Sequence, residues 1–190
     1  MNLVIFGPPG AGKGTQSGYI VKKYNLFQIS TGELLRNEIK NQKKLGIEIS
    51  SIINSGSLVS DKIVSNIIQK FISDKKYKDK LIFDGHPRNL AQAKNLDNLL
   101  KKNDQKIDIV LKLSVTLETI KKRILERKSI EKRADDNEKI AIKRFETYEQ
   151  SSEPVINYYK QSKLLNVVNG ENSISQISDE ISRLIDSIKG

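Results

Sequence analysis

A glycine-rich segment at residues 7–15, GPPGAGKGT, limits the possible folds of this chain more than any other stretch. It follows an apolar run at 3–6 that is typical of a short buried strand, and it precedes a mixed polar and apolar run at 16–24 that is typical of a helix. Strand, glycine-rich loop and helix in this order form a phosphate-binding loop, in which backbone N–H groups and the helix N-terminus face the oxyanions. A plain Gly/Pro turn is the alternative, and the full match of the context argues against it.

The lysine of this loop supplies the charge that such a site needs. The spacing Gly7-x-x-x-x-Gly12-Lys13 fits a phosphate-binding loop, and Lys13 provides a mobile positive charge for the β- and γ-phosphates of a nucleotide. Gly14 stands where a Ser or Thr is usual, and the hydroxyl comes one residue later at Thr15. The segment therefore predicts nucleotide phosphate binding with one local departure from the usual motif.

The rest of the chain alternates short apolar runs with longer segments of helical periodicity. The runs that predict strands lie at 3–6, 27–29, 81–83, 109–113 and 164–168. Strands that alternate with helices predict an α/β fold, in which helices cover both faces of a parallel sheet. About fifty residues separate the second and third runs, which is too many for one crossover helix. Residues 30–59 are therefore expected to form a small helical insertion.

Several helix ends are predicted from local signals. A capping-box pattern at 30–33 predicts that Ser30 caps a helix, and Thr116 and Ser173 are expected to cap two later ones. The polar segment at 128–134 predicts a short exposed loop between two helices. The second of these helices is expected to begin at 135–136 and to bend or restart at Pro154.

The last helix has an apolar stripe that is expected to face inward. Its residues are Ile174, Ile177, Ile181, Leu184, Ile185 and Ile188.

Composition excludes several classes of protein. A length of 190 residues predicts one domain, the lack of cysteine excludes disulfides and Cys-ligated zinc, and no apolar run approaches the ~20 residues of a membrane span. Residues 2–6 are too short for the apolar region of a signal peptide, so a cytoplasmic protein is the default expectation. The net charge of +10 allows a nucleic-acid partner, but the lysines are scattered and only 6% of residues are aromatic. We therefore expect no nucleic-acid partner.

The arginines are few and stand out against this background. The chain has 26 lysines and 7 arginines, so arginine is used where its planar, permanently charged fork is needed to bind phosphate. These residues are Arg36, Arg88, Arg123, Arg127, Arg133, Arg144 and Arg183. Arg183, in the last predicted helix, is expected to be a plain surface residue.

A carboxylate follows the third predicted strand. Asp84 ends the apolar run LIF at 81–83 and precedes Gly85. Beside a phosphate-binding loop, an aspartate at this point is expected to hold magnesium, directly or through water, because Mg²⁺ prefers oxygen ligands and keeps several waters. A turn-capping role is the alternative.

Six segments in a fixed order give the chain a specific resemblance. They are GPPGAGKGTQ at 7–16, STGELLR at 30–36, GSLVSD at 56–61, DGHPR at 84–88, RADDN at 133–137 followed by KR at 143–144, and EPVI at 153–156. In sequence and order they resemble the adenylate kinase family from residue 1 to about residue 172. The final helix contributes only its amphipathic pattern.

That resemblance implies a fold, an activity and a set of partners. It implies a phosphate-loop NTPase fold, with a five-stranded parallel sheet covered by helices on both faces, in one domain over residues 1–190. The core is expected at 1–29, 60–126 and 137–190, an AMP-binding insertion at 30–59 and a short lid at 127–136. The implied reaction is the magnesium-dependent transfer of a phosphoryl group from ATP to AMP, giving two ADP, in a cytoplasmic monomer without nucleic-acid or membrane partners.

The resemblance also assigns roles to matched positions. The residues expected to bind ATP are Gly10, Ala11, Gly12, Lys13, Gly14, Thr15, Arg123, Arg127 and Asn172. The residues expected to bind AMP are Thr31, Arg36, Ser57, Leu58, Val59, Gly85, His86, Pro87, Arg88, Gln92, Arg133 and Arg144. The expected catalytic residues are Lys13, Arg88, Arg127, Arg133 and Arg144, with Asp84 as the magnesium residue.

Three departures from the family pattern stand out. His86 occupies a position where the family usually has another aromatic residue, and we expect it to pack rather than to transfer protons, because phosphoryl transfer needs no such base. Glu33 replaces a commoner aspartate. The lid is short and lacks the inserted hairpin of longer family members, so no structural zinc is expected.

Other functions remain open at this point. A sister kinase that acts on UMP or CMP is disfavoured by Thr31 and Gln92, since that family tends to have Ala and Asn there and Gln can pair with the adenine edge. A switch-type NTPase would need switch segments and usually an Asn-Lys-x-Asp motif, which we do not find. Turnover with different nucleoside monophosphates separates these possibilities.

Overall fold

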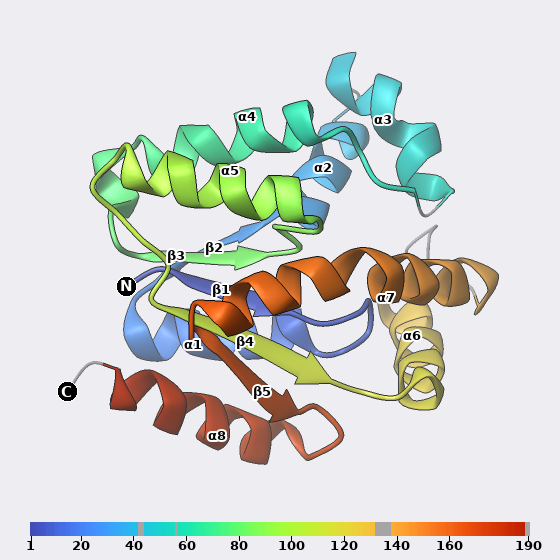
Figure 1. Ribbon diagram of the computed structural model, residues 1–190. Coiled ribbons are helices and arrows are strands. Elements are labelled where there is room, and N and C mark those ends of the chain that lie inside the picture. Colours follow the sequence, from blue (N-terminus) through green and yellow to red (C-terminus); the bar gives the residue numbers. More distant parts are fainter. Residues whose placement is uncertain (42–43, 56, 132–137, 189–190) are drawn as a thin grey trace.

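The computed structural model describes residues 1–41, 44–55, 57–131 and 138–188 of the chain. Within these residues a five-stranded parallel sheet forms the centre of the molecule, with the order β2-β3-β1-β4-β5 (Figure 1). The strands are β1 Leu3–Phe6, β2 Phe27–Ser30, β3 Leu81–Asp84, β4 Ile109–Ser114 and β5 Leu165–Asn169. The predicted α/β fold is confirmed, and each predicted strand end lies within one residue of its observed position.

The central strand β1 explains why helices cover both faces of the sheet. Val4 and Phe6 belong to the apolar core on one face, and Leu3 and Ile5 belong to the core on the other. All four are at most 5% exposed, because successive side chains of a strand point to opposite faces.

Five helices supply most of the helical residues that bury these two faces. α4 Asp61–Ile72, α5 Leu90–Lys101 and α7 Glu138–Gln161 supply the first core, and α1 Lys13–Tyr24 and α8 Ile174–Ser187 supply the second (Figure 1).

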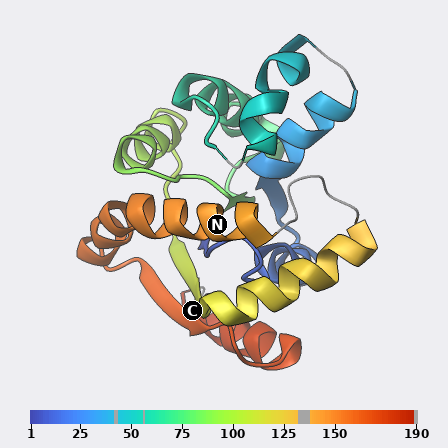
Figure 2. The same cartoon turned by 90° about the vertical axis from the view of Figure 1, so that its right-hand side faces the viewer.

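Two further groups of helices lie beyond the carboxyl ends of the strands. α2 Thr31–Lys40 and α3 Lys44–Asn54 pack together, and both lie in the segment 30–59 that was predicted to be helical. α6 Leu117–Glu131 packs against α7. Separately from these two groups, a 3-10 turn at Lys75–Tyr77 lies between α4 and β3. Figure 2 looks at the carboxyl ends of the strands, with α2 and α3 (blue and cyan) on one side and α6 (yellow) on the other.

The helix predicted to start after Ser30 does begin there, as α2, but its predicted side-chain cap is wrong. Ser30 makes no side-chain hydrogen bond to the first turn of α2. It is the last residue of β2 and pairs with Asp84 of β3, so the sheet fixes the point at which α2 begins. Thr116 and Ser173 do cap their helices: Thr116 Oγ1 accepts a hydrogen bond from the Thr119 N–H, and Ser173 forms a full capping box with Gln176.

The last helix also differs from the prediction at its two ends. Ile174 is 65% exposed and Ile188 is 45% exposed, whereas Ile177, Ile181 and Ile185 are buried. The exposed pair stands at the first residue of α8 and at its C-cap, where the helix extends past the apolar face that covers the sheet. Helical periodicity alone does not locate that limit.

The region between α6 and α7 corrects two further predictions. α6 continues to Glu131, so residues 128–131 of the predicted loop are helical, while 132–134 and the predicted helix start at 135–136 lie outside the described residues. α7 runs without interruption through Pro154. A proline removes one backbone hydrogen bond, and the buried side chains of Val155 and Tyr159 hold this part of α7 on the sheet.

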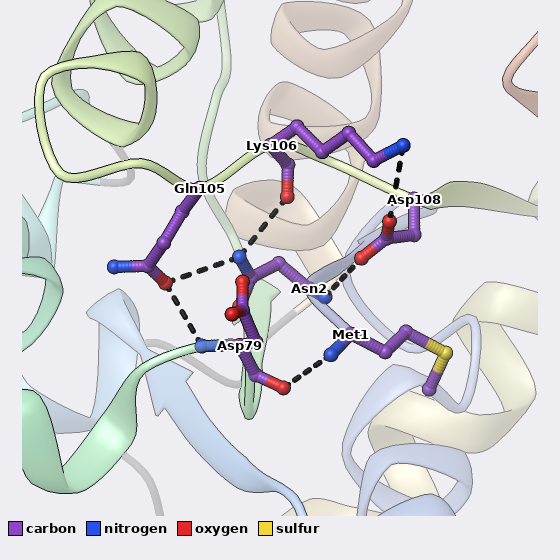
Figure 3. Close-up of polar contacts among 6 residues, drawn as sticks. All are labelled: Met1, Asn2, Asp79, Gln105, Lys106 and Asp108. Carbon is purple, nitrogen blue, oxygen red and sulfur yellow. Dashed lines mark hydrogen bonds and ion pairs between the residues drawn. The ribbon is translucent and has the colours of Figure 1, made fainter.

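A buried polar network joins the starts of the strands (Figure 3). Asn2, which is fully buried, donates its backbone N–H to the Asp108 carboxylate at 2.7 Å. Its side-chain Nδ2 donates to Gln105 Oε1 at 3.2 Å and to the Lys106 carbonyl at 3.0 Å, and its Oδ1 accepts from the Leu81 N–H at 3.1 Å. One side chain thus links β1 to β3 and to the segment before β4.

Gln105 extends the network to α4. Its Oε1 also accepts from the Asp79 N–H at 3.0 Å, and its Nε2 donates to the Ile72 carbonyl at 3.1 Å. The Met1 ammonium group donates to the Asp79 carbonyl (Figure 3). These contacts hold the amino ends of the strands together. The loops that follow the carboxyl ends of the strands are not part of this network.

Candidate active site

The glycine-rich loop connects β1 to α1 at the carboxyl edge of the sheet. Gly12, the N-cap of α1, has φ of 94°, a left-handed backbone conformation that favours glycine. The loop therefore turns the chain directly from the strand into the first turn of α1. Backbone N–H groups at a helix N-terminus attract anions because they have no partners within the helix.

Lys13, the first residue of α1, folds back over this loop. Its Nζ donates hydrogen bonds to the Gly7 carbonyl at 2.6 Å and to the Pro8 carbonyl at 3.0 Å. Burial lowers the pKa of Lys13 to about 8, an effect that the negative charge of Asp84 partly opposes. The ammonium group is thus held at the loop by carbonyl oxygens that a phosphate group can replace.

The loop forms one wall of a cleft of about 750 Å³. All the residues expected to bind ATP line this cleft: Gly10, Ala11, Gly12, Lys13, Gly14, Thr15, Arg123, Arg127 and Asn172. Arg123 reaches it from α6 and donates to the Ala11 carbonyl at 3.4 Å and to the Gly170 carbonyl at 2.9 Å. Residues distant in sequence therefore converge where the sequence predicts a nucleotide phosphate.

Three further arginines line the same cleft. They are Arg36 of α2, Arg88 after β3 and Arg144 of α7. Arg88 Nε donates to the Gly85 carbonyl at 2.8 Å. Burial, with the positive charge of Arg144 next in size, lowers the pKa of Arg88 to about 10, while the charge of Asp84 acts in the opposite direction. Cations gathered at this density form a site for a polyanion.

A smaller pocket of about 50 Å³ adjoins the cleft and shares Arg36, Arg88 and Arg144 with it. The residues expected to contact AMP are distributed between the two. Thr31, Ser57, Val59 and Gln92 line the smaller pocket, His86 and Pro87 line the larger one, and Leu58 and Gly85 line both.

Gly85 and Thr31 bring β3 and α2 together at this point. Gly85 has φ of 76°, and a Cβ added there would lie 2.9 Å from Thr31 Oγ1. The Thr31 hydroxyl donates to the Gly85 carbonyl at 3.0 Å. Glycine is thus required at position 85 both by its backbone conformation and by the close approach of α2.

Asp84 lies at the end of β3 and is 8% exposed. Its Oδ2 accepts a hydrogen bond of 3.0 Å from Gln28 Nε2, and both residues line the large cleft. The sequence analysis missed Gln28, which orients the carboxylate from the neighbouring strand β2. Within the described residues, no group of three or more His, Asp or Glu side chains forms a metal cluster.

His86 is 2% exposed, and its Nδ1 is buried without a hydrogen-bond partner. Burial, with a smaller contribution from the charge of Arg88, lowers the pKa of His86 to about 3. The ring is therefore neutral near pH 7. This favours the expected packing role over proton transfer.

One expected site residue cannot be placed, and several lining residues were not expected. Arg133 lies outside the described residues. The unexpected residues include Thr147, Tyr148, Ser151 and Ser152 on one face of α7. Their spacing of three and four residues was the available signal, but it does not distinguish a site face from a core face.

The fold and the cleft together define a phosphate-loop nucleotide-binding protein of the α/β class. The sequence model of the family described as "Adenylate kinase" matches residues 5–164. The chain therefore belongs to the adenylate kinase family and is a nucleoside monophosphate kinase.

Three relatives, each named adenylate kinase, match over almost their whole lengths. The protein from Pelagibacter ubique is 39% identical, with 97% of this chain and 99% of the relative aligned. That from Porphyromonas gingivalis (strain ATCC 33277) is 38% identical, with 100% and 97% aligned, and that from Azobacteroides pseudotrichonymphae is 41% identical, with 99% and 98% aligned. None of the helices described in this chain is both long and apolar enough to cross a membrane.

Proposed function

We propose that this protein binds ATP and AMP in one cleft and transfers the γ-phosphoryl group of ATP to AMP, giving two ADP. The observation that carries the proposal is the double set of phosphate-binding groups along this cleft. The glycine-rich loop with Lys13 forms one set, and Arg36, Arg88 and Arg144 form the other. A single nucleotide would not need both.

The loop is the donor half of the site. In the proposed complex, residues 10–15 surround the ATP phosphates with backbone N–H groups, and Lys13 exchanges its two carbonyl partners for phosphate oxygens. Arg123 and Arg127 lie four residues apart on α6, so they share one helix face above this loop. We assign Arg123 to the adenine ring and Arg127 to the phosphates, with Asn172 near the base.

The smaller pocket and its arginines are the acceptor half. Arg36 and Arg88 hold the AMP phosphate, because a guanidinium group binds phosphate oxygens in pairs. Thr31, Gly85 and Gln92 surround the nucleoside. The other assigned contacts to AMP are Ser57, Leu58, Val59, His86 and Pro87.

The transfer itself requires in-line positioning and neutralisation of charge, with little covalent chemistry by the protein. Lys13, Arg88, Arg127 and Arg144 lie around one cleft and are assigned to the transferring group. Arg133 is assigned with them from the sequence. The AMP phosphate is the nucleophile, so no protein side chain needs to be phosphorylated.

Magnesium is proposed as the cofactor, held by Asp84 directly or through water, because a carboxylate oxygen is a ligand that Mg²⁺ prefers. Mg²⁺ binds with one or two carboxylates, substrate phosphates and several waters, so one oriented carboxylate beside a phosphate loop fits it. Gln28 occupies one Asp84 oxygen and leaves the other for a magnesium-bound water. When bound, the ion would supply positive charge that offsets the negative charge of the ATP phosphates.

Water must be excluded from the cleft, because it would compete with AMP for the phosphoryl group. We assign this task to the lid at 127–136 and to the insertion at 30–59. Of these two segments, the described helices α2 and α3 and the end of α6 flank the carboxyl ends of the strands (Figure 2). We further propose a cytoplasmic monomer that acts on free nucleotides and not on nucleic acids.

A panel of acceptors tests the proposed function. ADP formation from MgATP is measured with AMP, CMP, UMP or GMP as the acceptor. We expect turnover with AMP to exceed turnover with the others by orders of magnitude. A preference for UMP or CMP would identify a sister kinase, and ATP hydrolysis without any acceptor would identify a switch-type NTPase.

A further inference from the structure

The amide of Gln92 is held at both ends by partners of opposite kind. Its Oε1 accepts a hydrogen bond of 2.7 Å from the Arg88 backbone N–H, and its Nε2 donates one of 2.6 Å to Asp61 Oδ1. A backbone N–H can only donate, and an ionised carboxylate can only accept. The two partners therefore permit one orientation of the amide, with its oxygen toward Arg88 and its nitrogen toward Asp61.

A second amide holds Asp61 itself. Asn89, the N-cap of α5, accepts from the Gln92 backbone N–H at 2.8 Å. Because this N–H can only donate, the NH₂ group of Asn89 must point the other way, and it donates to both carboxylate oxygens of Asp61 at 3.2 and 3.1 Å. Asp61, the first residue of α4, thus joins the starts of two helices and receives two amide NH₂ groups.

The fixed amide still has hydrogen-bonding capacity. Beyond these two bonds the amide has a second N–H on Nε2 and a second lone pair on Oε1, and the side chain of His86 also hydrogen-bonds with this amide. Gln92 is 5% exposed and lines the smaller pocket, whose other walls include the apolar side chains of Leu35, Val59 and Val64. A base in this pocket therefore meets an amide whose donor end and acceptor end cannot be exchanged.

We propose that Asp61 is a positioning residue that sets the base selectivity of the acceptor site by fixing the polarity of Gln92. The proposal rests on the assignment of Gln92 to the AMP base in the proposed function. An amino group beside a ring nitrogen, as in adenine, offers a donor and an acceptor to the fixed amide. A 6-oxopurine offers a carbonyl instead of the amino group, and an amide free to flip could accommodate it.

Two other bases separate the effect of hydrogen-bonding polarity from the effect of base size. Cytosine has an amino group beside a ring nitrogen acceptor, as adenine does, so the fixed amide does not discriminate against it. The pocket can distinguish cytosine from adenine only by its smaller size. Hypoxanthine has the size of adenine and the opposite polarity. IMP and CMP are therefore matched probes, one for the polarity of Gln92 and one for the shape of the pocket.

The test measures kcat/KM for AMP, IMP and CMP in the full-length protein with Asp61→Asn. Asparagine keeps the size of the side chain but can present either an oxygen or an NH₂ group to Gln92, so one of the two contacts that fix the amide is lost and only the Arg88 N–H still favours the original orientation. We expect the preference for AMP over IMP to fall about tenfold, while the preference for AMP over CMP stays within about twofold. Glu118→Gln, which removes a negative charge from the first turn of α6, is the matched control and should change neither ratio.

Two further variants make the outcome decisive. Asp61→Ser, whose hydroxyl both donates and accepts, should lower the AMP-over-IMP preference as Asp61→Asn does. An unchanged preference in both folded Asp61 variants, or an equal loss for all three acceptors, would overturn the proposal. Gln92→Ala separates this failure from that of the proposed function: if it abolishes the preference while the Asp61 variants do not, Gln92 reads the base without the help of Asp61. If Gln92→Ala also leaves the preference intact, the assignment of Gln92 to the base is wrong.

Discussion

Arg88 is a buried, hydrogen-bonded cation among the arginines that line the cleft. It is buried beside two other arginines of the cleft, and its backbone N–H and Nε already bond Gln92 and Gly85. Burial and the neighbouring positive charges lower its pKa to about 10, so the guanidinium group remains charged near pH 7. A phosphate dianion would replace repulsion among these cations with attraction.

Replacing Arg88 with alanine should therefore abolish most of the activity without unfolding the protein. We expect kcat to fall by at least about a hundredfold, since groups that stabilise charge in a transition state contribute at this level. Steady-state assays with AMP and the thermal unfolding midpoint are the measurements. Arg183→Ala, which removes an exposed arginine of α8, is the control. A folded Arg88→Ala protein with a near-normal rate would contradict the assigned role.

The lowered pKa of Lys13 predicts how kcat/KM for ATP depends on pH. Burial lowers its pKa to about 8, so the ammonium group of the free enzyme is charged below pH 8 and loses its proton above it. We expect kcat/KM for ATP to decline above about pH 8, because kcat/KM follows the ionisation of the free enzyme. At saturating ATP, kcat should decline only at higher pH, since bound phosphates favour the charged ammonium. A kcat/KM that stays constant from pH 7 to 9.5 would be incompatible with this account.

At the scale of elements, the two edges of the sheet have different tasks. The carboxyl ends of β1 and β3 lead into the phosphate loop and Asp84, while the amino ends are joined by the network around Asn2 (Figure 3). Nothing in the sequence indicates that network, because a single Asn before an apolar run looks like an exposed residue. Its role depends on strands that are distant in the chain.

This separation predicts a loss of stability without a loss of activity. Asn2→Ala leaves buried donors and acceptors of β3 and the segment before β4 without partners, which should lower the free energy of unfolding by about 3 kcal/mol. Urea denaturation measures this loss, and the activity of the folded fraction should be unchanged. Asn103→Ala, which removes one local hydrogen bond to the Leu99 carbonyl, should cost less than about 1 kcal/mol. Equal effects of the two variants would show that the network does not stabilise the sheet.

At this scale, the elements that the sequence predicts correctly are those whose signals are local. Apolar runs identify the five strands, because a parallel sheet covered on both faces needs continuous apolar residues. The cap at Ser30, the inward position of Ile174 and the restart of the helix at Pro154 were wrong, because each depends on tertiary contacts. The partners of Gln92 and Asp84 escaped prediction for the same reason: Asp61 and Gln28 lie on other elements.

For the molecule as a whole, the order β2-β3-β1-β4-β5 places the phosphate loop after the central strand. Helices from both halves of the chain then bring arginines to one cleft: Arg36 from α2, and Arg123, Arg127 and Arg144 from α6 and α7. The net charge of +10 thus includes a concentrated set of cations at the site as well as scattered surface lysines. The central claim is that this cleft holds two nucleotides at once.

Transfer of a labelled phosphoryl group tests that claim most directly. The protein is incubated with AMP, Mg²⁺ and ATP labelled in its γ-phosphate, and the products are separated. The account predicts that the label appears in the β-phosphate of ADP, that ADP forms at two molecules per AMP consumed, and that no ADP forms when AMP is omitted. Label released as inorganic phosphate at the same rate with and without AMP would contradict it.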